Sequence, residues 1–296
     1  MSGRLSARAL LRHLRLPFNA LLSPIYLWGA WLAPGEPEAA RLVLGWLALH
    51  VFLYGGTTAF NSFYDRDEGP IGGMRHPDPV PSRLLPWSLV VQLAGLPLAW
   101  ALGPAFATTY LVLGLLAAAY SHPATRWKAS PGASLSVVAL GQGGVGSLAG
   151  WWAALGRDAN PATELATVGP WWAAFVAATV LVGQYVVSQA YQVEEDGRRG
   201  DRTIAVVLGA GRALRLALVP AAIGAVSMLV TIAVIAGWPW ALPGGILGAF
   251  VALRQLRWSA RVGSGDLHDD FREAMALSLL SGAGLSAYLL ALITIA

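Results

Sequence analysis

Long apolar stretches alternate with short polar segments along the whole chain. A helix needs about 20 apolar residues to cross the hydrocarbon core of a bilayer. The chain therefore predicts a single all-α integral membrane domain over residues 1–296. Stretches of sufficient length predict nine transmembrane helices, at roughly 15–34, 42–64, 84–101, 104–121, 133–154, 169–193, 214–236, 240–257 and 272–295.

The composition supports a membrane location. Hydrophobic residues make up 56% of the chain and charged residues only 12%, with a mean hydropathy of +0.56, whereas soluble domains carry about 25% charged residues. The absence of cysteine excludes disulfides, thiolate metal sites and cysteine nucleophiles. The pI of about 9.7 is better explained by a membrane topology signal than by nucleic-acid binding. We therefore expect membrane lipid, and no nucleic acid, among the partners.

The basic residues are distributed unevenly between the loops. With nine spans, the N-terminus and the loops after the second, fourth, sixth and eighth spans share one side of the membrane. That side holds all of the 20 basic residues except Arg41 and Arg157. Basic residues accumulate in cytoplasmic loops, so this asymmetry supports the number of spans. It also predicts that this side faces the cytoplasm. Acidic segments follow the second and sixth spans on the same side, so an active site built from them would face the cytoplasm, and we expect the membrane to be the inner membrane of a prokaryotic cell.

The second span ends in the acidic segment Asn61-Ser-Phe-Tyr-Asp65-Arg-Asp67-Glu68. Carboxylates beside hydrocarbon are costly and therefore indicate functional sites. Asn61 and Asp65 are four residues apart, so a helix places both on one face, and Glu68 extends that face. Such oxygen ligands suit Mg²⁺, which takes its other ligands from water and substrate phosphates. A helix that simply ends in a solvated acidic loop explains this segment equally well.

The sixth span ends in a second acidic segment, in which Gln192 and Asp196 repeat the four-residue spacing. Both then share a helix face, and Ser188 and Gln189 continue a polar stripe into the membrane. A charged surface loop explains the arginines that follow, but not polar side chains inside an apolar run. Two acidic clusters on separate helices can hold divalent cations between them, and such cations bind phosphates. The two segments therefore point to an enzyme that acts on a lipid diphosphate.

Groups that can bind a phosphate directly lie nearby. Arg126 and Lys128 follow a proline-bounded turn at the end of the fourth span; the alternative is ordinary anchoring at the cytoplasmic face. In the second acidic segment, the backbone at Gly200 and the hydroxyl of Thr203 can close over a phosphate, and Arg199 is a further candidate contact.

The fifth span contains a glycine-rich stretch that resembles a phosphate loop only superficially. Gly146 and Gly150 are four residues apart and form a small-residue face, which is typical of close helix packing in membranes. We therefore expect this face to pack against a neighbouring helix.

The three polar segments together resemble the motifs of the UbiA superfamily of intramembrane prenyltransferases. That family shows Asn-x-x-x-Asp-x-x-x-Asp after its second span, Tyr-Ser-x-x-x-x-Arg-x-Lys after its fourth and Asp-x-x-x-Asp-x-x-x-Gly after its sixth. The matching residues here, in the same order and at the same spans, are Asn61, Asp65, Tyr120, Ser121, Arg126, Lys128, Asp196 and Gly200. The resemblance covers essentially the whole chain and implies a UbiA-like bundle of nine helices around a central cavity.

Two positions depart from the family pattern. The third acid of the first motif falls on Gly69; Glu68 is favoured as its replacement by helical geometry, with Asp67 as the alternative. The first acid of the second motif falls on Gln192, a neutral oxygen donor. Both changes lower the negative charge that faces the metals. The resemblance then implies the metal ligands Asn61, Asp65, Glu68, Gln192 and Asp196.

The resemblance implies transfer of a prenyl group from a polyprenyl diphosphate to a lipophilic acceptor, with an aromatic acceptor favoured. Two Mg²⁺ ions, with Asp65, Asp196, Arg126 and Lys128 as catalytic residues, neutralise the diphosphate so that the allylic C–O bond ionises. The implied substrate contacts are Asn19, Asn61, Tyr120, Ser121, Arg126, Lys128, Tyr185, Gln192, Arg199 and Thr203. One alternative is a membrane terpene cyclase, which uses the same ionisation without an acceptor. A transporter is less favoured, because acids at helix ends on one side do not suit alternating access.

Overall fold

The computed structural model describes residues 7–295, and within them the regular elements are all helices, apart from one isolated β-bridge between Ile71 and Met74. The two ends of the expected domain, residues 1–6 and 296, lie outside the described part. The all-α class predicted from the sequence is thus confirmed.

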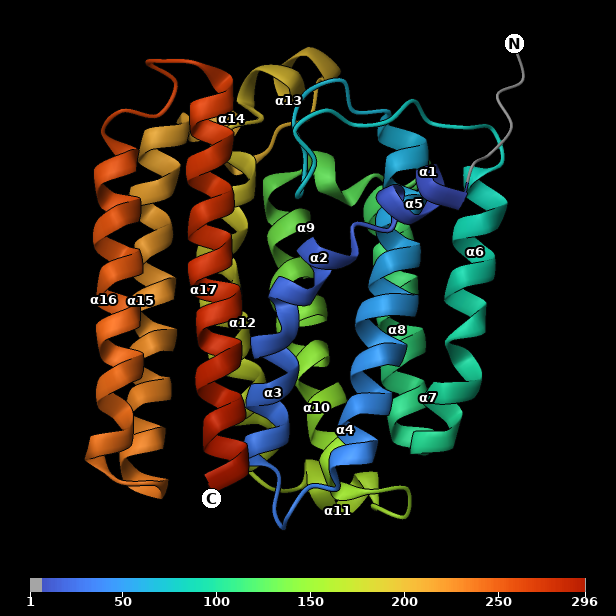
Figure 1. Cartoon of the computed structure of the whole chain (residues 1–296), viewed down its shortest axis with the longest axis vertical. Coiled ribbons are helices and arrows are strands. Elements are labelled where there is room, and N and C mark those ends of the chain that lie inside the picture. Colours follow the sequence, from blue (N-terminus) through green and yellow to red (C-terminus); the bar gives the residue numbers. More distant parts are fainter. Residues whose placement is uncertain (1–6, 296) are drawn as a thin grey trace.

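Long helices run side by side as a bundle (Figure 1). Their bounds are α2 Leu16–Asn19, η1 Ala20–Leu22 and α3 Ser23–Leu32; α4 Ala39–Trp46, the π-helical η2 Leu47–Leu53 and α5 Tyr54–Asp65; α6 Leu84–Ala94 and α7 Leu96–Leu102; α8 Pro104–Ser121; α9 Pro131–Ser136, the π-helical η4 Val137–Val145 and α10 Gly146–Leu155; α12 Gly169–Gln189; α15 Ala210–Ile235; α16 Trp238–Ser259; and α17 Leu267–Ile295.

Six helical stretches within residues 7–295 are long and apolar enough to cross a membrane. They are Ala39–Asp65, Leu84–Leu102, Pro104–Ser121, Gly169–Gln189, Ala210–Ile235 and Leu267–Thr294. The other three expected spans are also helical, over 16–32, 131–155 and α16, but they fall short of the same requirement for length and hydropathy. The bundle therefore has the predicted order of helices.

The breaks between neighbouring helices occur where the sequence places glycine and proline. α7 ends at Leu102 and α8 begins at Pro104, and Gly103 between them adopts φ 125°, a conformation that only glycine reaches easily. α15 ends at Ile235 and α16 begins at Trp238. Both breaks were predicted from the sequence, because proline fits the first turn of a helix but interrupts its interior.

Glycine also permits a close approach between α3 and α10. A Cβ atom added at Gly29 on α3 would lie 1.8 Å from the backbone oxygen of Ser147, and one added at Gly150 on α10 would lie 1.8 Å from that of Tyr26. The expected packing face at Gly150 is thus confirmed, because no larger residue fits there.

Short helices and loops gather at one end of the bundle, the upper end in Figure 1. They comprise α1 (Ala7–His13), α13 (Val193–Arg199), α14 (Ile204–Leu208) and the irregular segment 66–83. The 3₁₀ turn η3 (Trp127–Ala129) joins them, because the Arg202 N–H donates to the backbone oxygen of Ala129 over 3.0 Å. α11 (Pro161–Leu165) and the C-terminal end of α17 lie at the opposite end. All three polar segments singled out in the sequence therefore meet at one end of the bundle.

Candidate active site

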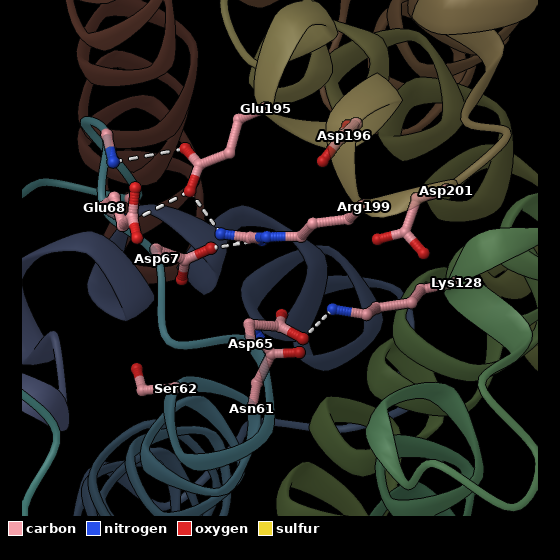
Figure 2. A network of polar contacts seen from close by, with 12 residues as sticks. Asn61, Ser62, Asp65, Asp67, Glu68, Lys128, Glu195, Asp196, Arg199 and Asp201 are labelled. Atoms are coloured by element: carbon pink, nitrogen blue, oxygen red, sulfur yellow. Dashed lines mark hydrogen bonds and ion pairs between the residues drawn. The ribbon is translucent and has the colours of Figure 1, made fainter.

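The centre of the site is an ion pair between the first and third polar segments. Asp65 is the last residue of α5, and its carboxylate pairs with the ammonium group of Lys128 on η3. Both side chains are largely buried, with exposed fractions of 4% and 9%. Figure 2 shows the two side chains pointing toward one another. The guanidinium Nη1 of Arg126 lies 4.0 Å from the same carboxylate. The negative charge of Asp65 is thus matched by two cations that lie 61 and 63 residues further along the chain.

Arg126 is itself held by an acid that the sequence analysis did not select. Asp201 accepts two hydrogen bonds from it, from Nε over 3.0 Å and from Nη2 over 2.9 Å. This forked geometry is the strongest form of arginine–carboxylate contact and fixes the plane of the guanidinium. Nη1 is left to face Asp65. The position of Asp201 directly after Gly200, which ends the second motif, was the only signal in the sequence.

Asp67 forms a second buried network close by. Its carboxylate, only 2% exposed, pairs with Nη1 of Arg199 over 2.8 Å and with Nη2 of Arg15 over 3.5 Å. Arg66, with φ 50°, ends α5 directly after Asp65 and turns the chain so that the next residue lies apart from the helix axis. Arg15 also donates to the hydroxyl of Ser62 over 2.7 Å. Asp67 therefore joins three separate parts of the chain, and its charge is shared by two arginines.

Glu195 on α13 binds the segment that follows Asp67. Its carboxylate accepts the backbone N–H of Glu68 over 2.9 Å and that of Gly69 over 3.2 Å, and it also pairs with Arg199. Figure 2 shows the Arg199 side chain extended between Asp67 and Glu195. The two acidic segments are thus joined directly, by hydrogen bonds and ion pairs between their own residues.

These groups surround a small cavity, which we call the polar cavity, of about 100 Å³. Most of the site residues predicted from the sequence line it: Asn61, Asp65, Tyr120, Lys128, Tyr185, Gln192, Asp196, Arg199 and Thr203. Asp67, Ser188, Gln189 and Asp201 line it as well. Four predicted residues do not: Asn19, Glu68, Ser121 and Arg126. Glu68 is exposed, whereas Asp67 is buried against the cavity, so the structure favours Asp67 over Glu68 as the additional acid.

The second motif places its acid in a partly buried setting. Asp196 on α13 accepts a hydrogen bond from the Thr203 hydroxyl over 3.2 Å. Burial raises the pKa of Asp196 to about 6, and the negative charge of Asp201 acts in the same direction. The hydrogen bond from Thr203 and the charges of Lys128 and Arg199 oppose this rise in pKa. A cation beside Asp196 would stabilise its ionised form further.

The oxygen donors around the polar cavity fit magnesium. Asn61, Asp65, Gln192 and Asp196 all line it, and carboxylate and amide oxygens are suitable ligands for this hard cation. Within residues 7–295, however, no three His, Asp or Glu side chains are grouped as a ready-made metal site. This combination suits Mg²⁺ bound by one or two carboxylates together with water and substrate phosphates, rather than by a cage made only of protein.

Two apolar cavities adjoin the polar cavity. The central cavity, of about 220 Å³, shares Asn61, Tyr120 and Tyr185 with it. The lateral cavity, of about 260 Å³ and lined in part by α12 and α17, shares Tyr185 and Ser188 with it. The hydroxyl groups of Tyr120 and Tyr185 lie 2.8 Å apart, so this pair of tyrosines forms the boundary between polar and apolar space.

Two of the predicted substrate contacts lie in these apolar cavities instead. Ser121 lines the central cavity and donates to the Asn61 amide oxygen over 2.7 Å. Asn19 lines the lateral cavity, and its amide nitrogen donates to the Leu14 backbone oxygen and to the Thr58 hydroxyl, over 2.8 and 3.3 Å. Asn19 is 2% exposed and joins the start of the first span to α5.

A sequence model of the UbiA prenyltransferase family matches residues 22–294. The chain belongs to this family. The match confirms the resemblance seen in the three motifs. It also confirms the expected enzyme class, a UbiA-type prenyltransferase.

Among curated proteins, the chain is 29% identical over 158 residues to the protoheme IX farnesyltransferase of Aeropyrum pernix. The aligned part covers 52% of this chain and 49% of that relative, so the match spans about half of each protein.

Solved structures of UbiA homologues align over nearly the whole chain. Two of them come from Archaeoglobus fulgidus, one bound to GPP and Mg²⁺ and the other to DMAPP and Mg²⁺. Each aligns with a TM-score of 0.62 at 20% sequence identity. The alignments cover 97% of this chain and 99–100% of the homologue's chain. The apo UbiA homologue from Aeropyrum pernix K1 gives 0.61 at 20% identity, covering 91% of this chain and 97% of its own. At this level of identity the likeness establishes the UbiA fold.

The two departures from the UbiA motifs have different structural settings. At Gly69, a Cβ atom would lie 2.6 Å from Oε2 of Glu195. The Glu195 carboxylate therefore fills the space that an acidic side chain at position 69 would need. Gln192 directly precedes α13 and lines the polar cavity. It thus lies where the first acid of the second UbiA motif is expected.

Proposed function

We propose that this UbiA family member transfers the prenyl group of a polyprenyl diphosphate to a lipophilic acceptor. One observation carries the proposal: a polar cavity lined by acids and cations shares Tyr185 with two apolar cavities. A prenyl diphosphate has the same division into a charged head and an apolar tail. The solved structures of UbiA homologues bound to GPP or DMAPP with Mg²⁺ support prenyl diphosphates as the substrate class.

The diphosphate head would lie in the polar cavity. Lys128 contributes its ammonium group from the cavity wall, and Arg199 contributes its guanidinium. Arg126 acts from beside the cavity, through the Nη1 group that Asp201 leaves facing Asp65. These cations stabilise the charge that collects on the diphosphate when the allylic C–O bond breaks.

Metal ligands would come from both acidic segments. We assign Asp65 and Asp196 as the principal carboxylates, with Asn61 and Gln192 as neutral oxygen donors and Asp67 nearby. Magnesium, when bound as two ions, supplies positive charge beside the leaving diphosphate and orients it. The chain's own residues hold these oxygens in place through the networks of Arg15, Arg199 and Lys128.

The prenyl cation left after ionisation would lie at the tyrosine boundary. Aromatic faces stabilise a nearby cation electrostatically, and Tyr120 and Tyr185 line both the polar and the central cavity. The apolar walls beyond them exclude water, which would otherwise capture the cation. An acceptor that reaches this boundary from the central cavity would then form the new bond to the cation and lose a proton.

The membrane arrangement belongs to the same proposal. We infer a single membrane domain of nine spans, because helices 16–32, 131–155 and α16 run alongside the six membrane-length helices (Figure 1). The polar cavity would face the cytoplasm of a prokaryotic cell, on the side rich in basic loops.

The test is release of pyrophosphate by the purified protein in lipid nanodiscs. The protein is incubated with a panel of prenyl diphosphates, with and without Mg²⁺, and with aromatic acceptors that include haem, since a protoheme IX farnesyltransferase is a relative. Mg²⁺-dependent release, with a prenylated acceptor identified by mass spectrometry, supports the proposal. A cyclised hydrocarbon formed without acceptor would identify a terpene cyclase instead. No release from any donor would refute both activities.

A further inference from the structure

A fourth cavity lies within the membrane region and takes no part in the site described above. This side chamber, of about 410 Å³, lies between α12, α15, α16 and α17. Small residues create it. Gly248 and Ala252 are four residues apart and share one face of α16, and Ala225 lines the chamber from α15. Small side chains on two facing helices leave space that larger ones would fill.

The side chamber is continuous with the active site. It shares Val180, Gln184, Ser281 and Leu285 with the lateral cavity. The lateral cavity in turn shares Tyr185 with the polar cavity. A path therefore leads from the diphosphate-binding groups, between α12 and α17, into the side chamber. Gln184 lies on α12, five residues before that helix ends at Gln189, or roughly 7–8 Å along the helix axis.

The junction between the lateral cavity and the side chamber carries a single polar contact. The Ser281 hydroxyl donates to the Leu277 backbone oxygen over 2.7 Å and approaches the Gln184 amide oxygen at 3.2 Å. The serine is thus satisfied by its own helix, and the weaker contact to Gln184 can be lost at little cost. The junction can therefore open to an apolar chain without leaving a buried hydroxyl unpaired.

We propose that the side chamber receives the far end of a long polyprenyl chain, so that it sets the preferred length of the donor. This inference rests on the proposed function, because it assumes a prenyl diphosphate in the polar cavity. The lining of the chamber contains no charged side chain, which suits an uncharged isoprenoid tail. Its continuity with the diphosphate site favours the donor's own tail over the acyl chain of a membrane lipid.

Gly248→Phe tests the proposal. A Cβ atom added at Gly248 meets no other atom within 4 Å, so the new ring can enter the chamber without moving the backbone. Ile246→Phe is the matched control, because Ile246 on the same helix is 71% exposed on the outer surface. The assay compares kcat/KM for geranyl diphosphate, with two isoprene units, and geranylgeranyl diphosphate, with four.

We expect Gly248→Phe to lower kcat/KM for the four-unit donor by roughly tenfold or more. The new ring would fill the chamber, so the far end of the prenyl tail would no longer make several of its methylene contacts. The two-unit donor, which ends before the chamber, should be unaffected, and Ile246→Phe should change neither value. Equal effects on both donors, or no effect on either, would overturn the inference. Wild-type turnover of the two-unit donor shows that the underlying function holds, so the two failures are distinguishable.

A second measurement covers the case in which Gly248→Phe does not fold. Ala225→Leu fills the same chamber from α15 and should alter the preference in the same direction. A geranylgeranyl diphosphate with a photoreactive group at its far end should label peptides of α15 and α16 in the wild type. Labelling confined to α3 and α17 would contradict the proposal. Native mass spectrometry gives a further check: a phospholipid that stays bound after the donor is added would also contradict it.

Discussion

Replacing Gly69 by alanine should disrupt the contact that joins the two acidic segments. The added Cβ atom would lie 2.6 Å from Oε2 of Glu195, closer than van der Waals contact permits. Gly69 has no positive φ, so alanine brings no backbone strain and the substitution isolates this one contact. The carboxylate, the flexible end of its side chain, must shift by several tenths of an ångström, which weakens the hydrogen bonds that it accepts from the backbone N–H groups of Glu68 and Gly69.

The size of the effect follows from those two hydrogen bonds. Each N–H donates to a charged oxygen, at 2.9 and 3.2 Å, and such bonds contribute about 1.5–3 kcal/mol each. The bonds are weakened rather than lost, and water replaces part of the loss at the exposed Glu68, so we expect a destabilisation of about 1–2 kcal/mol in total. The shift of Glu195 also weakens its ion pair with Arg199, which stays paired with Asp67. We therefore expect KM for the prenyl diphosphate to rise more than kcat falls.

A double-mutant cycle separates this contact from other effects. In a Glu195→Ala background, the extra methyl at position 69 no longer meets a carboxylate, so Gly69→Ala should then cost less than about 0.5 kcal/mol. Gly197→Ala on α13 is the control, because a Cβ atom there meets nothing within 4 Å. Thermal unfolding in detergent and pyrophosphate release give the two readouts. Equal costs of Gly69→Ala in the two backgrounds would refute the reasoning.

Four further substitutions test the assignment of roles. Asp65→Asn and Asp196→Asn should each lower kcat by roughly 10²–10³-fold, since each removes a charge from the clamp on the leaving diphosphate; near-normal Mg²⁺-dependent rates in both would contradict the metal site. Gln192→Asp adds a charged ligand and should lower the Mg²⁺ concentration for half-maximal rate; an unchanged midpoint with a lower melting temperature would make Gln192 a packing residue. Asp201→Asn should raise KM by roughly tenfold, because an amide cannot accept both hydrogen bonds from Arg126; an unaltered KM would show that Asp201 does not position it.

The parts of the site that were predictable are those set by spacing within one helix or one turn. Asn61 and Asp65 were placed together by their four-residue spacing, and both line the polar cavity. Gln192 and Asp196 do so as well, across the start of α13. The helix breaks at Gly103 and at 236–237 were predictable for the same reason, because glycine and proline act on the local backbone.

The parts that were not predictable depend on contacts across the chain. Helical geometry favoured Glu68 over Asp67, but the helix ends at Asp65, and Arg66 adopts a left-handed conformation. Continuing the helical spacing beyond Asp65 was therefore wrong. Arg15 was read only as a topology signal, yet it is buried against Asp67. No local pattern reveals a partner 52 residues away.

The contacts of Asp67 and Glu195 bear on how the site handles metal charge. Three acids besides Asp65 and Asp196 lie at or beside the polar cavity. Two of them, Asp67 and Glu195, form ion pairs with the same arginine, Arg199. The third, Asp201, forms an ion pair with Arg126. Their negative charge is thus largely neutralised before any cation arrives. With Gly69 and Gln192 in place of two family acids, little free carboxylate charge remains to hold Mg²⁺ alone. A diphosphate brings its own negative charge and several phosphate oxygens. Metal and substrate should therefore bind cooperatively here, each raising the affinity for the other by the same factor.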